Sequence, residues 1–487
     1  MASYSERMMF RFSGRVGGVS FLGLLWFVSA PAGCIDQREV ADIGEIYRSA
    51  ARDDNPQRRP VIVIPGILGS RLAQRDTGRV VWGGFGGGYA DPSTPDGARL
   101  FAMPMGEGTA LADLRDDVVA DGALDRVRLS VFGLPLELNA YFNLLVTLGV
   151  GGYRDQQLAI AGAVDYGEAH FTCFQFAYDW RRSNVENAAL LKAFIEEKRE
   201  YIRGQLRKKY GRDCDDVKFG IVAHSMGGLL TRYFLRYGDA PLPENGDLPE
   251  LTWAGAQYVD KAILVGAPNA GSVSALDQLV RGARPAPIIE PYPAALVGTI
   301  PAIYELLPRG RHGALIVDND ESRVVEDLSD IGVWRQYHWG PFDSRQARPL
   351  ATLLPDAADD DARRRVAIDH LGKCLTNARR FQAALDRPAT PPADLELCLY
   401  AGDAIATPAV LSVNSRDGSL STHATAAGDG TVPRYSALMD ERRGGAYRPT
   451  LQSPVGWRHI TFLFEDHLGL TKSATFSDNI LMELLEL

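Results

Sequence analysis

The chain has 487 residues, too many for one minimal domain, so it holds either several domains or one large domain with insertions. Its 23% charged and 46% hydrophobic residues are typical of a globular protein and exclude a disordered, collagen-like or coiled-coil chain. With 52 basic and 61 acidic side chains the net charge is −9, so we expect no nucleic-acid partner, because phosphates are bound by clustered Lys and Arg.

The N-terminal residues have the pattern of a secretion signal. Three arginines within the first fifteen residues precede an uncharged stretch at 16–35, which includes Ala-Gly-Cys at 32–34. A basic start, a short apolar core and a small-residue exit are the parts of a signal peptide. The Ala-Gly-Cys ending resembles a bacterial lipobox, in which the cysteine becomes the lipidated first residue. We therefore expect residues 1–33 to be a signal peptide and Cys34 to be lipidated.

This pattern also predicts where the protein is found. We expect an exported chain, either a membrane-anchored lipoprotein of the periplasm or outer membrane or a secreted protein. An anchor helix that is kept is the alternative, since twenty uncharged residues just reach the length that spans a bilayer. Residues 34–58 are polar and are interpreted as a tether that precedes the folded part at 59–487.

Strands and helices alternate through the folded part. The run Val-Ile-Val-Ile at 61–64 is typical of a strand buried on both faces. Ser183 and Glu186 have the spacing of a capping box that opens a helix ending at Gly211, and a second helix runs from Met226 to about Gly238. The other predicted strands cover residues 171–178, 217–223, 259–265, 395–402 and 460–464. This order predicts an α/β fold with a mostly parallel sheet and helices on both faces.

Two long intervals, at about 71–170 and 272–394, interrupt the alternation. The first contains the Gly-rich residues 83–88, and the second contains a predicted long helix at 355–385. Because insertions of this size usually carry function, we interpret both as cap or lid segments of one catalytic domain.

The sequence Ala-His-Ser-Met-Gly at 223–227 lies between a predicted strand and a predicted helix. In a tight strand-to-helix turn only small flanking residues fit, and the turn projects the serine hydroxyl from the top of the sheet. The following helix also directs its free N–H groups at the oxyanion that forms in acyl transfer. We therefore predict that Ser225 is a nucleophile, although Ala223 stands where such turns usually have glycine.

A serine nucleophile needs a histidine later in the chain. His459 and His467 are the two histidines in the last fifty residues, and they flank the predicted strand 460–464. Functional groups gather at the carboxyl ends of parallel strands, so His467 is the predicted base and His459 a surface or strand-edge histidine. His224 is expected to pack beside the nucleophile rather than act as its base.

The acid that orients the histidine has two candidates. Asp403 directly follows the predicted strand 395–402, and Asp429 lies in Gly-Asp-Gly-Thr-Val-Pro at 428–433. The glycines around Asp429 favour it modestly, because a tight turn would present its carboxylate to an imidazole N–H. The pattern of strands alone does not separate the two.

Two backbone N–H groups are expected to form the oxyanion hole. One belongs to Met226, directly after the nucleophile, and the other to Ile67 in the loop Pro-Gly-Ile-Leu-Gly-Ser at 65–70. Side chains matter little for this role. The alternative for residues 65–70 is a plain Gly-rich turn.

Several motifs together resemble lecithin:cholesterol acyltransferase-like proteins, which include lysosomal phospholipase A2 and phospholipid:diacylglycerol acyltransferase. They are the segment 60–72 with Val81-Trp82, Tyr-Asp-Trp-Arg at 178–181, the serine motif, Ile-Tyr-Glu-Leu-Leu-Pro at 303–308 and Gly-Asp-Gly-Thr-Val-Pro at 428–433. The resemblance spans about residues 60–470. It implies an α/β-hydrolase fold with cap and lid, and a Ser225–Asp429–His467 triad acting on glycerolipid esters. It therefore favours Asp429 over Asp403.

The resemblance also bears on function. It implies a serine lipid acyl hydrolase or acyltransferase that cleaves glycerophospholipid or related esters, passes the acyl group to water or an alcohol, and needs no metal or cofactor. Trp82 resembles a lid tryptophan, with a buried aromatic as the alternative. Membrane association would use the N-terminal lipid and the lid. The rival functions are a carboxylesterase or triacylglycerol lipase, and a lipid-binding lipoprotein without catalysis.

The five cysteines have an odd count that a lipidated Cys34 would explain. Four would then remain in an oxidising compartment. We expect a disulfide between Cys374 and Cys398, which flank the end of the second insertion, and this would leave Cys173 and Cys214 for a second bridge.

Overall fold

The structure is a computed structural model that describes residues 42–52, 58–83, 90–123, 126–131, 134–139, 141–284, 291–443, 445 and 448–486. Residues Ala41–Leu487 form one compact unit. The predicted signal peptide, Cys34 and most of the Gly-rich loop at 83–88 lie outside the described residues. None of the helices that the structure describes has the length and hydropathy needed to cross a membrane.

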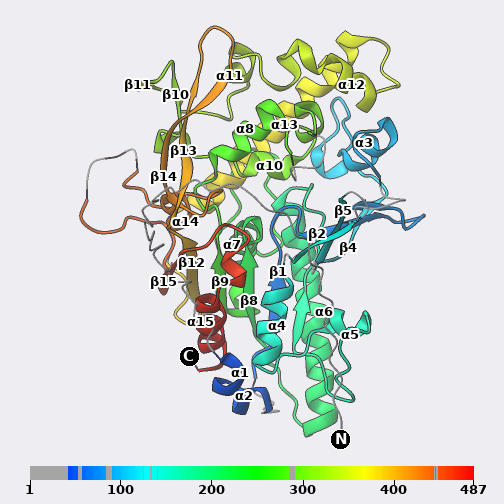
Figure 1. The fold of residues 1–487 in the computed structure, drawn as a ribbon, viewed down its shortest axis with the longest axis vertical. Helices are drawn as coiled ribbons and strands as arrows, with labels where there is room; N and C mark the ends of the chain where they lie inside the picture. The colour runs from blue at the N-terminus through cyan, green and yellow to red at the C-terminus, as the bar shows by residue number, and fades with distance from the viewer. Residues whose placement is uncertain are drawn as a thin grey trace, which may run out of the picture. The chain divides into compact units, whose positions relative to one another are not determined.

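A six-stranded parallel sheet forms the centre of the molecule, in the order β15-β12-β9-β8-β1-β7 (Figure 1). Its strands are β1 Val61–Ile64, β7 Cys173–Gln175, β8 Phe219–His224, β9 Val259–Val265, β12 Glu396–Gly402 and β15 His459–Leu463. The predicted strands are therefore all present, with some ends shifted by one to three residues. The predicted fold class, a mostly parallel α/β sheet, is confirmed.

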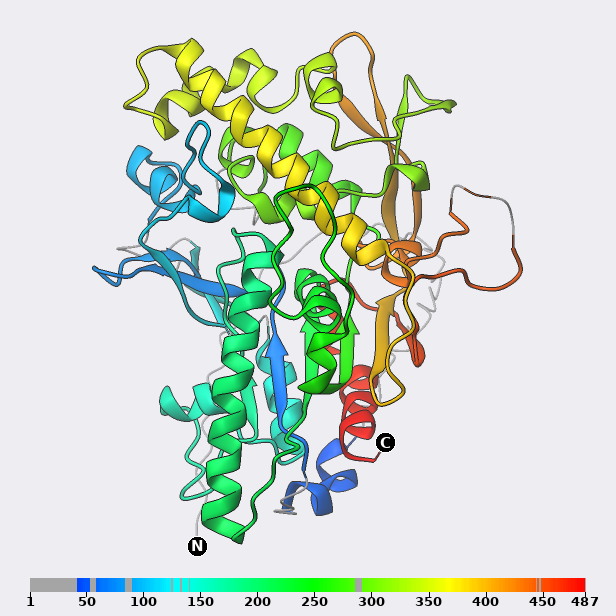
Figure 2. The same cartoon turned by 180° about the vertical axis from the view of Figure 1, so that it is seen from behind.

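Helices cover both faces of this sheet (Figure 2). The helices α4 Phe142–Val150 and α15 Ala474–Leu485 cover one face, and α6 Asn184–Tyr210 and α7 Met226–Tyr237 cover the other. Successive strand residues alternate between the faces, so Val61 and Val63 pack with α4 and α15 while Ile62 and Ile64 pack on the other side. Because both faces are buried, the strands are apolar throughout, as residues 61–64 predicted.

The ends of α6 follow from the residues at its two termini. The Ser183 hydroxyl accepts from the Val185 N–H at 3.2 Å, and Gly211 closes the helix with a positive φ of 61°. Glu186, however, does not return to complete the predicted capping box. Its carboxylate pairs with Arg182 at 3.1 Å, which holds the first turn against the preceding loop.

The predicted first insertion is only partly a cap. Its helix α4 packs on the sheet, since Leu144, Leu145 and Leu148 belong to the core beneath the strands. The rest forms two small antiparallel sheets and short helices. These are β2 Ser70–Gln74, β3 Val80–Trp82, α3 Pro95–Phe101, β4 Val118–Ala123, β5 Arg126–Val131, β6 Leu134–Asn139 and α5 Gln156–Ile160.

The predicted second insertion extends beyond the boundary at residue 394. Two of its strands join two later ones in a four-stranded sheet of order β11-β10-β13-β14, so the insertion cannot be separated from residues 405–428. The predicted long helix is α13 Asp360–Asp386, which lies beyond the carboxyl ends of the central strands (Figure 1). The remaining elements are α8 Val273–Arg281, α9 Ala294–Val297, α10 Pro301–Glu305, β10 Leu315–Val317, β11 Asp320–Val324, α11 Ile331–Gln336, α12 Ala347–Leu353, β13 Ile405–Val413, β14 Leu420–Gly428 and α14 Arg434–Leu438.

Two other predictions need correction. The tether at 34–58 contains helices α1 Ile43–Ile46 and α2 Arg48–Arg52, and the Tyr47 hydroxyl anchors them to Asp478 of α15 at 3.0 Å. The disulfide between Cys374 and Cys398 is not formed, because both thiols are free. Cys374 lies on α13, above the sheet, whereas Cys398 lies in the sheet itself. Cys173 and Cys214 are likewise free.

Candidate active site

Ser225 occupies the turn between β8 and α7. Its backbone has φ 54° and ψ −125°, a conformation that residues other than glycine rarely adopt, and its N–H donates to the carbonyl of Val265 at 2.8 Å. This is the strained strand-to-helix turn that the motif at 223–227 predicts. Ala223 is fully buried in β8, so its methyl group is accommodated where glycine is usual.

Close backbone packing explains the glycines around this serine. A Cβ on Gly66 would lie 2.7 Å from the Ser225 Cβ, and one on Gly227 would lie 2.5 Å from the carbonyl oxygen of Pro65. A Cβ on Gly228 would meet the Cβ of Ala267 at 2.6 Å. Real Cβ atoms do not approach so closely. Glycine is therefore needed at 66 and 227 to let the loop at 65–70 touch the Ser225 turn, and at 228 to let α7 pack against Ala267.

His467 lies beyond the carboxyl end of β15, where its imidazole meets two partners. Its Nε2 is 2.9 Å from the Ser225 Oγ, and its Nδ1 is 2.8 Å from Asp429 Oδ2. The His467 side chain is 15% exposed and that of Asp429 is 1% exposed. The structure thus brings three of the predicted residues into one hydrogen-bonded series with the histidine in the middle.

Asp429 follows β14, and hydrogen bonds hold both its carboxylate and its backbone carbonyl. Its Oδ1 accepts the N–H groups of Thr431 and Val432 at 2.9 and 2.6 Å, and its backbone carbonyl accepts the N–H of His467 at 2.9 Å. Burial alone would raise the pKa of Asp429, but the hydrogen bond and charge of His467 and the two backbone N–H groups outweigh burial and lower it. The carboxylate is therefore ionised and directed at the imidazole.

Asp403, the other predicted acid, points elsewhere. Both of its carboxylate oxygens accept from Arg434, at 3.0 and 2.9 Å. The geometry therefore joins Asp429, and not Asp403, to His467. Asp403 directly follows β12, whereas Asp429 reaches the same end of the sheet from a strand outside it.

The loop at 65–70, which holds the predicted oxyanion donor Ile67, lies against Ser225. The N–H of Met226 is at the first position of α7, where a helix has no internal acceptor for it. On the other side, the carbonyl of Gly66 accepts from Gly69 at 3.0 Å, and Leu68 has a positive φ of 62°, which turns the loop sharply around Ile67. The two predicted donors thus lie on the two segments that meet at Ser225.

Trp82 is buried rather than on a mobile surface, with only 6% exposure. Its ring packs edge-on against Phe101 and Trp180, with centroids 6.2 and 5.8 Å away, and its indole N–H donates to the carbonyl of Leu68 at 2.7 Å. This placement favours the buried-aromatic alternative. Trp82 thus holds the loop at 65–70 through its hydrogen bond to Leu68.

The motif at 178–181 is structural. Arg181 is fully buried and forms two hydrogen bonds to Asp179, at 2.9 and 2.8 Å, and an ion pair to Asp116 at 2.8 Å. Glu305, in the motif at 303–308, is also fully buried. Burial raises its pKa to about 7, although four hydrogen-bond donors around the carboxylate counteract this.

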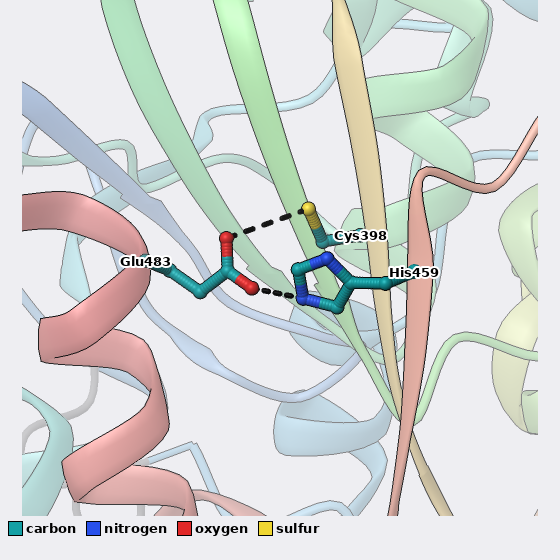
Figure 3. Close-up of side chains that lie close together, drawn as sticks. All are labelled: Cys398, His459 and Glu483. Atoms are coloured by element: carbon teal, nitrogen blue, oxygen red, sulfur yellow. Dashed lines mark hydrogen bonds and ion pairs between the residues drawn. The ribbon is translucent and has the colours of Figure 1, made fainter. Parts of the chain in front are cut away.

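One group of His, Cys and acidic side chains in the described part of the chain lies close enough to hold a metal ion: Cys398, His459 and Glu483. Figure 3 shows Glu483 reaching from α15 toward the other two, which are paired residues of β12 and β15. His459 contacts the Glu483 carboxylate, and the Lys261 ammonium lies 3.5 Å from it and 3.1 Å from Glu396.

Protein groups surround the Glu483 carboxylate, namely the Lys261 ammonium, the His459 ring and the Cys398 thiol. Burial, and then Glu483, raises the pKa of Cys398 to about 12, so the sulfur is a thiol and not the thiolate that metals bind. The Lys261 ammonium faces both carboxylates, and the His459 ring contacts Glu483. We assign the cluster to fastening α15 onto the sheet, and His459 to that structural role.

Sequence reasoning did not identify Tyr141, which lies directly behind the triad. Its hydroxyl accepts the N–H of Gly66 at 2.8 Å and lies 3.0 Å from Nδ1 of His224. Tyr141 belongs to none of the motifs and precedes a helix of the predicted cap, so nothing in the local pattern marks it.

Comparison with known proteins agrees with this fold. Residues 160–330, which include the serine motif and the segments at 178–181 and 303–308, match the family model of lecithin:cholesterol acyltransferase. The chain matches none of the curated protein sequences with which it was compared.

Among solved structures, a chain of the Tle4-Tli4 complex aligns with a TM-score of 0.55 at 14% identity, covering 89% of this chain and 99% of that chain. The lin2722 gene product from Listeria innocua aligns at 10% identity and a TM-score of 0.26, covering 88% of this chain and 95% of that one. EstA from Clostridium botulinum aligns at 13% identity and a TM-score of 0.33, covering 88% of each chain. The last two scores are too low to support an argument.

The first of these alignments supports the fold over most of the chain, and the family match supports an acyl-ester hydrolase or acyltransferase. The predicted resemblance to the lecithin:cholesterol acyltransferase family is thus confirmed over residues 160–330, and the chain has the predicted α/β-hydrolase fold.

Proposed function

We propose that this chain is a serine-dependent lipid acyl hydrolase or acyltransferase that cleaves glycerophospholipid or related acyl esters. The observation that carries the proposal is the hydrogen-bonded series of Ser225, His467 and Asp429, with spacings of 2.9 and 2.8 Å, beside the loop of Ile67. A hydroxyl, an imidazole and an ionised carboxylate in this order form the arrangement that activates serine for acyl transfer.

In the first half-reaction, Nε2 of His467 takes the proton of Ser225 as its Oγ bonds to the ester carbonyl carbon. The N–H groups of Ile67 and Met226 stabilise the negative charge on the carbonyl oxygen, and Asp429 stabilises the imidazolium. The tetrahedral intermediate then expels the alcohol portion of the lipid, which takes the proton from His467. An acyl-enzyme on Ser225 remains.

In the second half-reaction, His467 deprotonates an incoming hydroxyl, which attacks the acyl-enzyme. Water releases a fatty acid, and an alcohol forms a new ester. Mass spectrometry of the products, with and without an added alcohol acceptor, distinguishes hydrolysis from acyl transfer.

A lipid substrate is supported by apolar side chains around the base. Phe464 is 73% exposed, Leu468 50% and Phe462 38%, so three of the large exposed hydrophobic residues lie within five positions of His467. Exposed apolar side chains that gather in one place mark surfaces for lipid or protein. The adjacent Glu465 and Asp466 are acidic, which favours a zwitterionic over an anionic lipid surface.

We also propose that the chain is exported and is held at a membrane by a lipid on Cys34. The basic start, the short apolar core and the Ala-Gly-Cys sequence at 32–34 support this. With a net charge of −9, the chain gains little electrostatic attraction to anionic lipid, so contact with the bilayer would depend on the lipid anchor and apolar surface.

The nucleophile assignment is tested with Ser225→Ala. We expect a fluorophosphonate probe to label the wild type and not the variant, and ester hydrolysis to fall by roughly 10⁴-fold or more. Ser477→Ala is the matched control, because Ser477 is buried and bonds Thr147 at 2.9 Å on the face covered by α15. Labelling that survives in Ser225→Ala would disprove the assignment, and a wild type that is never labelled would favour a lipid-binding protein without catalysis.

The substrate class is tested by replacing Phe464 and Leu468 with serine together. We expect turnover of phosphatidylcholine vesicles to fall about tenfold, because each lost side chain removes on the order of 1 kcal/mol of apolar contact with lipid. Hydrolysis of a soluble short-chain ester should change by less than about twofold on the same reasoning. The control Ile160→Ser removes a side chain that is 70% exposed elsewhere.

Two outcomes would contradict the lipid proposal. If short esters are cleaved while a panel of phospholipids is not, the chain is a carboxylesterase. If the double variant loses activity equally on vesicles and on the soluble ester, the two side chains act on the triad and not on a lipid surface.

A further inference from the structure

A buried chain of hydrogen bonds runs behind the triad and links its two sides. It begins at the N–H of Gly66, passes through the Tyr141 hydroxyl at 2.8 Å and Nδ1 of His224 at 3.0 Å, and ends where Nε2 of His224 meets the backbone carbonyl of His467 at 2.9 Å. Tyr141 and His224 are 4% and 3% exposed. Water therefore does not compete for these contacts.

The two ends fix the direction of every hydrogen bond. The N–H of Gly66 can only donate, so the Tyr141 oxygen accepts there and its own proton is free for Nδ1 of His224. The carbonyl of His467 can only accept, so Nε2 of His224 carries the hydrogen. Both requirements select the same neutral tautomer, in which Nδ1 accepts and Nε2 donates.

The ionisation states agree with this direction. Burial raises the pKa of Tyr141, so its phenol keeps the proton that it donates. Burial, and then the charge of His467, lowers the pKa of His224 to about 3, so this ring stays neutral while His467 gains and loses its proton. His224 thus cannot replace His467 as the base.

The chain of hydrogen bonds joins the loop of Ile67 to His467, the two parts whose spacing determines the chemistry. Gly66 precedes Ile67, the proposed oxyanion donor, and the carbonyl that accepts from His224 belongs to the base itself. The other backbone hydrogen bond of His467, from its N–H to the carbonyl of Asp429, does not connect it to the loop of Ile67. Tyr141 and His224 are thus the direct hydrogen-bonded bridge between the donor loop and the base.

We propose that Tyr141 and His224 are positioning residues that hold the oxyanion loop and His467 at their working separation through this one directed chain. The proposal rests on the proposed serine mechanism, because a fixed spacing between donor and base matters only if an oxyanion forms on Ser225. A misplacement of about 1 Å in such a site can lower the rate about 100-fold.

The first test is Tyr141→Phe, which keeps the ring and removes both hydrogen bonds of the hydroxyl. We expect kcat for a soluble ester to fall about 10- to 100-fold with KM within about threefold, because the oxyanion donors act on the transition state rather than on bound substrate. Fluorophosphonate labelling should slow by the same factor.

Tyr237→Phe is the matched control. Tyr237 is also buried and its hydroxyl donates to the carbonyl of Ala384 at 2.7 Å, at the far end of α7 from Ser225. Its loss should lower Tm by an amount similar to that in Tyr141→Phe and leave kcat unchanged. If the two variants have the same kcat, Tyr141 is merely structural and the proposal is overturned.

A double-variant cycle tests whether the two residues act as one chain. In His224→Gln the amide can still donate to the carbonyl of His467 but no longer accepts from Tyr141, so it breaks the bond that Tyr141→Phe also breaks. We expect the double variant to lose no more activity than Tyr141→Phe alone. If the activity losses of the two single variants multiply in the double variant, the residues act independently and the proposed chain of hydrogen bonds is contradicted.

These results separate the proposal from the function on which it rests. If the wild type neither cleaves esters nor reacts with the probe, the serine mechanism fails. If the wild type is active and Tyr141→Phe retains the wild-type kcat, only the positioning role fails.

Discussion

At the scale of single residues, the site depends on groups that are tied down by the backbone. His467 is held through its own N–H, which donates to Asp429, and through its carbonyl, which accepts from His224. Ser225 is held by its turn and by the N–H bond to Val265. The imidazole therefore has its position set before any substrate arrives, as efficient acyl transfer requires.

The buried neutral His224 makes stability depend on pH. Its pKa is about 3 in the folded chain and about 6.5 when exposed, so below pH 6.5 the unfolded chain binds a proton that the folded chain does not. This contribution is fully present above pH 6.5 and is lost as the pH falls. Between pH 7 and 5 we expect the wild type to lose about 2 kcal/mol more than His224→Gln, measured by urea unfolding at both values.

The comparison with His224→Gln is essential, because Glu305 changes the stability in the opposite direction as the pH falls. The raised pKa of Glu305, about 7, gives stability that is lost as the pH rises through 7, and this contribution is shared by both proteins. Equal losses in the wild type and in His224→Gln would contradict a neutral His224.

Single residues differ in how far the sequence could predict them. Ser225 and His467 are marked by a strand on one side and a turn on the other, so their positions followed from local pattern. Asp403 and Asp429 have the same local description, and only tertiary structure brings the second to the imidazole. Tyr141 carries no local signal, because its role arises entirely from contacts with residues far away in the chain.

At the scale of secondary-structure elements, Glu305 ties three helices together. From α10 its carboxylate accepts the hydroxyl of Ser183 at 2.6 Å and two N–H groups of Asn184, at 2.9 and 2.6 Å, all at the start of α6. It also accepts from Asn377 of α13 at 2.7 Å. The cap helix α13 is thus joined to the catalytic half through one buried carboxylate.

Replacing this carboxylate should loosen the cap without changing the triad. Glu305→Gln leaves one acceptor oxygen for four donors, so we expect unfolding free energy at pH 8 to fall by roughly 2–4 kcal/mol, since unpaired buried donors are costly. Urea denaturation measures this loss. The folded variant should still react with the fluorophosphonate probe, and Glu326→Gln, at an exposed carboxylate, should have wild-type stability.

A Glu305→Gln variant as stable as the wild type would show that the four donors find other acceptors. A variant that is stable but unreactive would instead place Glu305 in the catalytic machinery.

Some elements could not be predicted from local sequence. The buried strands were recognisable because both faces are apolar. β14, however, exposes most of its length and contains Ser, Thr, His and Ala, and β13 has register shifts between Pro408 and Leu411, so neither shows the regular alternation of a half-buried strand. Helices α1 and α2 have only four and five residues, too few to show a helical period, and the Tyr47 hydroxyl joins them to α15.

At the scale of the whole molecule, residues Ala41–Leu487 form a single compact unit. The predicted insertion boundaries do not match the structure. Helix α4, within the first insertion, covers the central sheet, and β10, within the second insertion, pairs with β13 beyond residue 394. Boundaries inferred from gaps between strands fail wherever an inserted element returns to the core.

The backbone ties of His467 have a consequence for how this enzyme could change over time. His467 is fastened through its own main-chain N–H and carbonyl, and not through the exposed side chains of Phe464 and Leu468. They can be exchanged without moving the imidazole. Under the proposed function, the apolar surface at these two positions can therefore diversify, and with it the preferred lipid, while the chemistry remains constant.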